Sequence, residues 1–508
     1  MLNRRTLLAA SVAAGLTGCS RPAPPDGLLR VATTNLPDSL DPARGEFASA
    51  ALAYKQLHAG LTEYAADGSV APGLAESWTF REDGRRWYFH LRDGLTWSDG
   101  HPLTAEDVVW SARRLVDPAQ SFAQLGDFFA IENARAVLAG EMPPEAMGVA
   151  ALNERSVEFR LTDPLGLLPV LMREFYPFPR HVIERHGADW VRPENLVTAG
   201  AYTLTGESQL HLSMTRNPAY YDAARVAIPA IRLDAVQDAA TRVRLFRAGD
   251  YDLADQPPAN QIGFLRDRLG ERFRSFDAPI LRYLKLNHAR APLAAAETRR
   301  ALSGAIDRAF IAGEFFAGTA SPTRHVVPVI DPEAGAAGAA GASPALEIGR
   351  PLQIRTTPGD NERIALAVAD DWQRAGVETE IFVTYATDLY QAVDAGDYDV
   401  AVASFNRGLK ADPFFMLDPF APGGFADNFN WQDAEFAGAM ARARRETDPA
   451  ARALAYQQAE ARLFEETAII PLLHERAHWM VSDRVAGTRS DIQPMLWREL
   501  SLLPTELE

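Results

Sequence analysis

Residues 352–405 read LQIRTTPGDNERIALAVADDWQRAGVETEIFVTYATDLYQAVDAGDYDVAVASF, and this stretch decides the fold class. Its apolar and β-branched runs predict three strands, at 352–357, 377–385 and 398–405. The segments between them, 361–376 and 388–396, have the composition and length of helices. Strand–helix–strand units of this spacing imply a parallel sheet with helices on its faces. The sequence therefore predicts an α/β protein.

Local signals outside this stretch predict further elements. The run LLRVATT at 28–34 predicts a strand near the start of the folded part. Thr104 followed by Asp107 is a capping-box pattern before a periodic apolar run, which predicts a helix there. Asp448 before Pro449 predicts the start of a late helix that ends near Glu466.

Length and charge limit the possible functions. The chain has 508 residues, enough for about three domains of ordinary size. It carries 51 Lys and Arg against 67 Asp and Glu, a formal net charge of −16. An acidic chain of this kind does not offer the basic surface that nucleic acid or an anionic membrane requires.

The N-terminus has the pattern of an exported lipoprotein. Arg4 and Arg5 precede an apolar run that is too short to span a bilayer, and Cys19, the single cysteine, follows Leu-Thr-Gly. This pattern resembles a bacterial lipobox, in which the cysteine carries lipid after cleavage. We therefore expect a signal peptide at 1–18 and a tether at 19–27, with general secretory and twin-arginine export both open.

His474, Glu475 and His478 form the H-E-x-x-H motif of zinc metalloproteases, and Glu499 lies where some of those enzymes place a third ligand. The surrounding IIPLLHERAHWMV alternates like a strand, and residues four apart in a strand are separated by about 13 Å. One zinc ion cannot bind both histidines at that distance. We expect no metal site here, and a secreted zinc protease remains the remote alternative.

Several segments together resemble one family, the extracytoplasmic solute-binding proteins of peptide ABC importers, similar to the oligopeptide- and dipeptide-binding types. The resemblance covers nearly the whole mature chain and is most specific at 74–118 and 286–311. The other matching segments are SLDPA (39–43), 176–204, RNPAYYD (216–222) and RLFRAGDYDLAD (244–255).

The resemblance implies a two-lobed periplasmic-binding-protein fold of type II, with mixed sheets, flanking helices, a two-strand hinge and an extra inserted domain. The expected division is lobe I at 28–72, 194–285 and 478–508, the inserted domain at 73–193, and lobe II at 286–477. It also implies a monomeric, membrane-anchored periplasmic or cell-surface protein that is not an enzyme, has no cofactor, and works with permease and ATPase subunits. A receptor for a nickel chelate, an opine, a glycan or a modified peptide is the alternative within the family.

The resemblance places the ligand between the lobes. A peptide of varied sequence is best held through its backbone, so amides and aromatic rings are suitable groups. The expected ligand-binding residues are Asn35, Leu36, Tyr283, Asn287, Phe405, Asn406, Arg407, Leu409, Asn428 and Asn430.

One residue departs from the family pattern. Peptide binders usually place an aspartate four residues before the proline of an Asp-Pro or Glu-Pro pair, where it pairs with the α-ammonium of the peptide. Here that position is Leu409, between the cationic Arg407 and Lys410. A buried ammonium without a carboxylate is costly. Either Asp412 or Asp427 substitutes, or the ligand is anionic, blocked at its N-terminus, or not a peptide.

Overall fold

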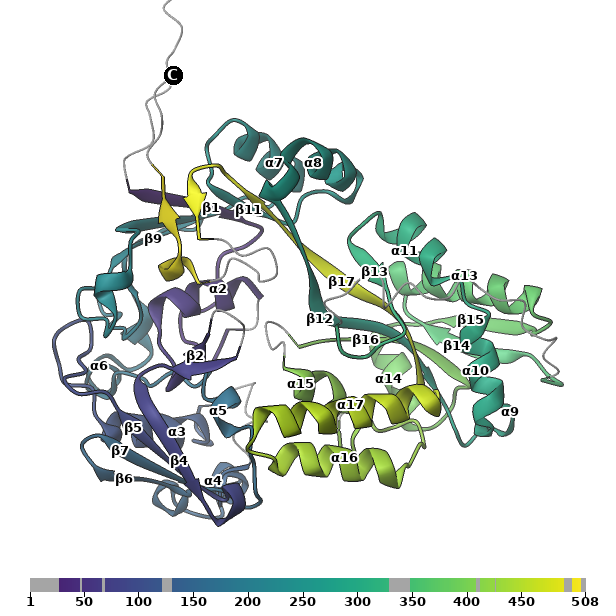
Figure 1. Ribbon diagram of the computed structural model, residues 1–508, viewed down its shortest axis with the longest axis horizontal. Coiled ribbons are helices and arrows are strands. Elements are labelled where there is room, and N and C mark those ends of the chain that lie inside the picture. Colours follow the sequence, from purple (N-terminus) through teal and green to yellow (C-terminus); the bar gives the residue numbers. More distant parts are fainter. Residues whose placement is uncertain are drawn as a thin grey trace, which may run out of the picture.

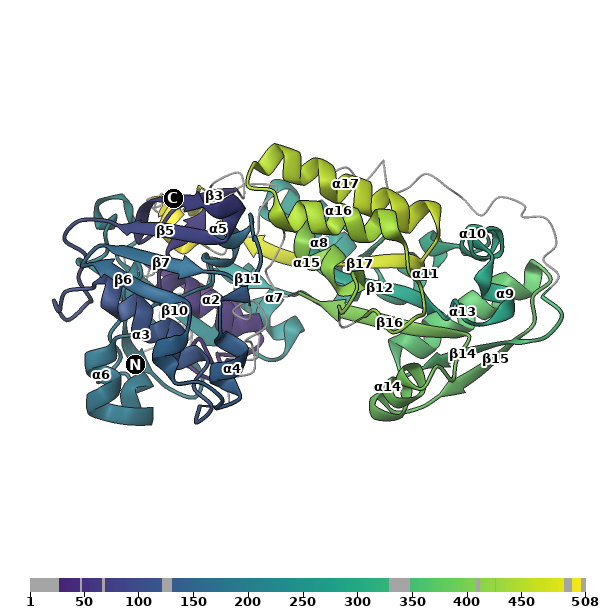
Figure 2. The same ribbon diagram turned by 90° about the horizontal axis from the view of Figure 1, so that it is seen from below.

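The computed structural model describes residues 27–45, 48–65, 69–120, 130–328, 348–407, 412–424, 426–487 and 496–503. Two bodies lie side by side along the longest axis of the molecule, and two long strands run between them (Figures 1 and 2). The first body holds the elements from β1 (Leu28–Thr33) to β11 (Leu253–Asp255). The second body holds those from α9 (Ala291–Ala294) to α17 (Pro449–Glu465).

One sheet of 11 strands passes through both bodies in the order β15-β14-β16-β12-β17-β11-β1-β10-β9-β8, with β13 paired to β17. The sheet is mixed, because β1 is parallel to β10 and β11 whereas β12 is antiparallel to β16 and β17. Its other strands are β8 (Tyr202–Glu207), β9 (His211–Arg216), β10 (Ala230–Ala235), β12 (Phe273–Leu286), β13 (Ala320–Pro322), β14 (Leu352–Thr356), β15 (Thr379–Val383), β16 (Val400–Asn406) and β17 (Ile469–Val481).

The strand–helix alternation predicted from 352–405 is confirmed. β14 pairs in parallel with both β15 and β16, and the helices α13 (Asp360–Arg374) and α14 (Ala386–Asp394) connect them. Trp372 of α13 is fully buried and donates from Nε1 to the carbonyl of Leu302, 2.9 Å away. This contact fixes α13 against α10 (Ala296–Gly304) on one face of the sheet.

Alternation along β12 assigns its side chains to two different cores. Leu284 and Leu286 pack with α10, α11 (Arg308–Phe316) and α13. Tyr283, one residue away, points to the opposite face and packs with the core that includes α16 (Ala434–Arg445) and α17. Tyr283, the predicted site residue on β12, therefore lies on the second face.

A second sheet, in the order β4-β5-β7-β6, forms the lower part of the first body (Figure 1). Its strands are β4 (Ala75–Arg81), β5 (Arg86–Leu91), β6 (Val149–Asn153) and β7 (Ser156–Arg160), and α3 (Ala105–Leu115) contacts β6 and β7. The predicted capping box at the start of α3 is present, since the backbone N–H of Thr104 donates to Asp107 at 2.9 Å.

The remaining helices and strands of the described residues are β2 (Thr62–Tyr64), β3 (Val70–Pro72), β18 (Val485–Ala486), β19 (Ser501–Leu502), α2 (Ala48–Leu57), α4 (Ala134–Leu138), α5 (Leu168–Leu171), α6 (Arg180–His186), α7 (Ala239–Arg247), α8 (Ile262–Leu269) and α15 (Pro413–Leu417).

The strands β12 and β17 join the two bodies. They are 14 and 13 residues long and pair from Phe273 opposite Met480 to Lys285 opposite Ile469. The register shifts between Asp277 and Leu281, and such an irregularity interrupts the ladder and lets a strand bend. The chain can thus change direction between the bodies without losing the rest of the pairing.

The bodies also touch far from these strands. The N–H of Gly166 in the first body donates to the carbonyl of Arg444 in the second at 2.7 Å. Arg452 of α17 donates to the carbonyl of Glu446 at 3.0 Å, which holds the α16–α17 turn at this point. A Cβ on residue 166 would lie 1.9 Å from the carbonyl oxygen of Glu446, so only glycine fits this contact. The exact lobe and domain boundaries expected from the sequence stay a prediction.

Candidate ligand-binding site

The aromatic residues at the end of β16 form a cluster with β12. The ring centroids of Tyr283 and Phe405 are 5.9 Å apart, and Phe420 lies 5.5 Å and 5.8 Å from them. All three side chains are buried. Burial raises the pKa of Tyr283 well above its ordinary value, so its hydroxyl stays neutral. The cluster fixes the strand end from which Asn406 and Arg407 emerge.

Arg407 leaves β16 at the place where β12 changes register. Its backbone N–H donates to the carbonyl of Pro279 at 3.0 Å, and its guanidinium lies 5.7 Å from the ring centroid of Phe415. The cationic side chain is therefore positioned at the junction between the bodies. Asn406 is exposed and pairs with Ile280 in the sheet register.

Asn287 and Asn430 are brought together by a polar network. The side-chain amide of Asn287 donates to the carbonyls of Gly396 and Tyr398, each at 3.1 Å. Its oxygen accepts from the N–H of Ala289 at 3.1 Å and from the amide of Asn430 at 3.0 Å. Because both donors and both lone pairs are used, Asn287 holds the loops in place and has no capacity left for a ligand in this arrangement.

Lys285 joins the site, although it is not among the residues predicted from the sequence. This buried lysine donates to the side-chain oxygen of Asn428, whose amide donates to Asp394 at 2.6 Å. Burial lowers the pKa of Lys285 to about 8, although the charges of Asp394 and Asp427 oppose that shift. A usable signal was present, since Lys285 is one of only three lysines in an arginine-rich chain.

The other predicted site residues lie elsewhere. Asn35 is exposed and Leu36 half-buried, and both follow β1 in the first body, across the two connecting strands from β16 (Figure 1). Leu409 lies outside the described residues, and so does Cys19 with the predicted signal peptide and tether.

The H-E-x-x-H residues lie in β17, as the alternating pattern predicted. His474 donates from Nε2 to the carbonyl of His325 at 3.1 Å, and Glu475 is paired with Arg282 at 2.7 Å. His478 donates from Nε2 to the carbonyl of Gly318 at 3.0 Å and accepts at Nδ1 from Ser275 at 2.8 Å. These residues serve the strand pairing, and in the described part of the chain no group of three potential ligands could hold a metal.

The buried histidines predict an acid-sensitive fold. Burial lowers the pKa of His58, His288 and His478 to about 4 in each case. Unfolded histidines bind protons below about pH 6.5, so unfolding takes up protons between that value and pH 4. The free energy of unfolding should have its full value above pH 6.5. As the pH falls from 6.5 toward 4, it should decrease by up to about 1.4 kcal/mol per pH unit for each of these histidines.

His478→Gln should remove up to one proton from this uptake, which chemical denaturation at several pH values measures. Ser275→Ala is the control, because it removes a hydrogen bond to the ring and leaves the titrating group. An unchanged pH slope in the His478 variant would show that another group is responsible.

Comparison with known proteins identifies the family. Residues 69–427 match the bacterial extracellular solute-binding proteins, family 5 Middle, which is well over half of the chain. The chain belongs to the family 5 bacterial extracellular solute-binding proteins. Members of this family bind solutes and do not convert them, so the expectation that the chain is not an enzyme is confirmed.

Individual family 5 relatives align over nearly the full length. The probable deoxycholate-binding periplasmic protein YgiS of Escherichia coli is 28% identical, over 92% of this chain and 91% of that protein. The unliganded open form of the murein tripeptide-binding protein MppA has a TM-score of 0.82 at 23% identity, over 94% and 98% of the two chains. Haemophilus influenzae OppA in complex with RPPGFSPFR has a TM-score of 0.67 at 26% identity, over 95% and 100%. These matches confirm the two-lobed α/β fold.

Proposed function

We propose that this family 5 protein is the binding component of an ABC importer, and that it captures oligopeptides or peptide-like solutes between its two bodies. It then delivers them unchanged to a permease. In this proposal the chain is periplasmic or at the cell surface and is tethered by lipid on Cys19. Among the described residues, no helix is both long and apolar enough to cross a bilayer.

The observation that carries the proposal is the pair of strands β12 and β17. They are the elements through which the common sheet continues from one body to the other, and β12 has a register shift in the middle. Strand segments of this kind can absorb the rotation by which two bodies close on a solute. The predicted lobes, with 28–72, 194–285 and 478–508 on one side and 286–477 on the other, divide the chain near the ends of these strands.

Binding would use polar groups at Arg407, Asn428 and Lys285, with the buried aromatic cluster of Tyr283 and Phe405 holding the strand end in place. Asn35 and Leu36 would approach from the first body on closure. A closed site excludes water, so each hydrogen bond to the backbone of a peptide becomes stronger than in solvent.

The site is unusual in the groups that it offers to the N-terminus of a peptide. Asp412 already accepts from the N–H of Phe414 at 2.9 Å, where it caps α15. Asp427 already accepts from the N–H of Gly423 at 2.9 Å. With leucine at 409, neither carboxylate is a dedicated partner for an ammonium group, which favours ligands that are blocked there.

An amphipathic carboxylate is the second candidate ligand. Arg407 and Lys410 flank Leu409 in the sequence, and the buried Lys285 of β12 is a further cation of the candidate site. The relative YgiS is described as a probable deoxycholate-binding protein, and deoxycholate is an amphipathic steroid with two hydroxyl groups and one carboxylate.

Native mass spectrometry of the purified protein tests the proposal. We expect a bound species that a denaturing wash releases, and tandem fragmentation then distinguishes a blocked peptide from an amphipathic acid. Small-angle scattering should show a smaller radius of gyration after the ligand is added back. Saturable binding with no change in shape would contradict closure between the bodies.

A further inference from the structure

The contact at Gly166 joins the two bodies at a second place, apart from the strands β12 and β17. The N–H of Gly166, just before α5, donates to the carbonyl of Arg444 near the end of α16 at 2.7 Å. A Cβ on residue 166 would lie 1.9 Å from the carbonyl oxygen of Glu446 and 2.8 Å from that of Arg445. The backbone of the first body therefore rests directly on the turn between α16 and α17, and α5 lies beside the end of α17 in both views (Figures 1 and 2).

Arg452 of α17 strengthens this contact. Its guanidinium donates to the carbonyl of Glu446 at 3.0 Å and to the carbonyl of Gly166 at 3.5 Å, so it bonds to both bodies. The side chain is buried, and a buried donor that loses its acceptor costs more free energy than one on the surface. Moving the bodies apart at this point would break these bonds, whereas rotation about the point leaves them in place.

Gly166 is fixed within the first body. The N–H of Leu165 donates to the carbonyl of Gly84 at 3.2 Å, next to the strand β5. The side chains of Leu165, Leu167 and Leu168 are all buried in the core of that body. The segment before α5 therefore moves with the first body.

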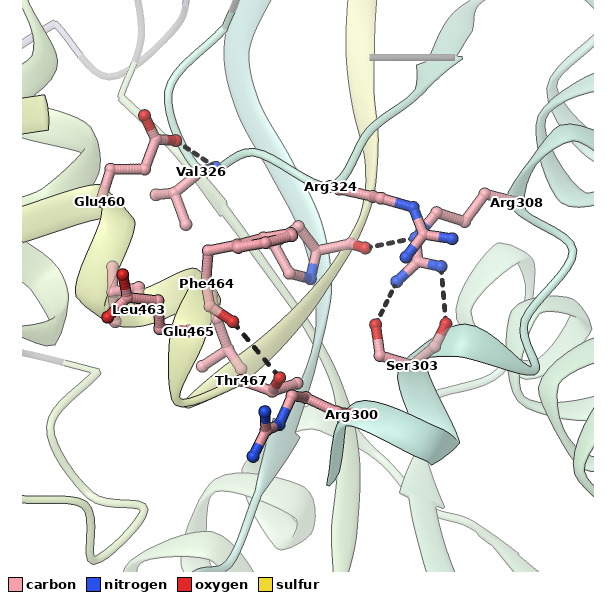
Figure 3. A pocket seen from close by; sticks show the side chains of 12 residues that line it. Arg300, Ser303, Arg308, Arg324, Val326, Glu460, Leu463, Phe464, Glu465 and Thr467 are labelled. Carbon is pink, nitrogen blue, oxygen red and sulfur yellow. Dashed lines mark hydrogen bonds between the residues drawn. The ribbon is translucent and has the colours of Figure 1, made fainter. Parts of the chain in front are cut away.

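The α16–α17 turn is fixed within the second body. At the far end of α17, beside a pocket of about 300 Å³, Glu460 accepts from the N–H groups of Val326 and Val327 at 2.8 Å and 2.9 Å (Figure 3). At the near end, the guanidinium of Arg444 donates to Asp418 at 2.6 Å, in the turn that follows α15. Since both ends are tied to other elements of the second body, α17 moves with that body.

A rigid body that is held at two separate places can rotate only about the line that joins them. One place is the irregular part of β12 between Asp277 and Leu281, and the other is Gly166. We propose that Gly166 and Arg452 are positioning residues for solute capture, because they form a second pivot that fixes the axis on which the bodies close. This inference rests on the proposed closure between the bodies.

The pivot determines where the molecule opens. Figure 2 shows α14 and α17 on opposite sides of the second body. With Gly166 on the axis, the bodies stay together at the α16–α17 turn, and the side of α14 moves furthest. A solute then enters and leaves on the α14 side.

Pulsed electron paramagnetic resonance between pairs of spin labels tests the pivot on the ligand-free full chain, with Cys19→Ser so that only introduced cysteines are labelled. One pair, Asp163→Cys with Ala441→Cys, lies near the contact. The other pair, Arg185→Cys with Gln391→Cys, joins α6 to α14, and all four native side chains are exposed. We expect a narrow distance distribution for the near pair and a broader one for the far pair. A near pair as broad as the far pair would overturn the proposal.

Gly166→Ala should lengthen the near distance by about 2 Å, because a Cβ 1.9 Å from an oxygen must move to an ordinary contact of about 3.5 Å. The far distribution should broaden at the same time, since the axis is no longer fixed. Gly263→Ala in α8 is the matched control, because its added Cβ meets no atom within 4 Å, and it should change neither distance.

Arg452→Met is a second variant, which removes the bonds of the guanidinium and leaves the backbone of both bodies unaltered. It should broaden both distributions, and it carries the test if melting curves show that Gly166→Ala does not fold. A change confined to the near pair would mean a local adjustment, and unchanged distances in the folded variants would mean no restraint. Either result would contradict a second pivot. Because no ligand is added, the result does not depend on whether native mass spectrometry finds a bound solute.

Discussion

A chain in which methionine replaces Lys55 should have a free energy of unfolding at pH 7 about 3 kcal/mol below that of the unaltered protein. Lys55 of α2 is buried and donates from Nζ to Glu174 at 2.8 Å. Glu174 also accepts from Tyr64 at 2.6 Å and from Tyr176 at 3.0 Å. Without the lysine, a partly buried carboxylate would lose the cation with which it forms an ion pair and keep most of its desolvation cost.

The pKa of Glu174 supports this expectation and supplies a second measurement. Burial alone would raise it, but the charge and hydrogen bond of Lys55 and the bonds from Tyr64 and Tyr176 outweigh burial and lower it to about 2. A lowered carboxyl pKa stabilises the fold above the ordinary value of 4.5, and this stabilisation is lost as the pH falls toward 2. The difference between Lys55→Met and the unaltered chain should therefore shrink over that range.

A double-mutant cycle isolates the pair. Glu174→Gln alone leaves the lysine buried without a carboxylate and should also destabilise, while Lys55→Met with Glu174→Gln should recover at least half of the loss. Urea denaturation followed by tryptophan fluorescence measures all four chains. Additive losses in the double variant would mean that packing around α2, and not the ion pair, is responsible.

Elements that depend on neighbouring residues were predictable. The capping box of Thr104 and Asp107 and the cap at Asp448 formed where the sequence placed them, because each bond joins residues three apart. The strands and helices of 352–405 agreed to within a few residues for the same reason. The strand interpretation of H-E-x-x-H held because alternation is also a local property.

Contacts between distant residues were not predictable from these signals. Lys55 and Glu174 are 119 residues apart, and Asn287 and Asn430 are 143 apart. Each asparagine looks like any exposed amide in the sequence, and only the fold shows that Asn287 is buried with every hydrogen bond made. Gly166 is a similar case, because its close approach to Glu446 follows from how the two bodies meet.

The same limit applies to the ligand. Family resemblance placed Arg407 and Phe405 at a strand end, and the fold puts that end beside the register shift of β12. Lys285 was not predicted because its role comes from burial, and the rarity of lysine in this chain was the one sequence signal that could have marked it. The side chain at 409 therefore offers the most direct way to ask what the site accepts.

Leu409→Asp should raise the affinity for a peptide with a free N-terminus by about tenfold or more, since a charge-assisted hydrogen bond in a closed site contributes about 1.5 to 3 kcal/mol. Tetra-alanine and its N-acetylated form are suitable probes, and calorimetry measures both. The affinity for the acetylated peptide should not rise, because that peptide has no ammonium group to pair with the aspartate.

Leu409→Asn is the matched control for this change, because it has nearly the same size and polarity as aspartate and no charge. It should leave the preference between the two peptides close to that of the unaltered chain. Asp412 and Asp427 already accept backbone hydrogen bonds at 2.9 Å, which is why the unaltered chain is expected to bind the free peptide weakly. If the unaltered chain binds free tetra-alanine as tightly as the aspartate variant does, one of these two carboxylates serves the ammonium, and Asp412→Asn and Asp427→Asn would identify which.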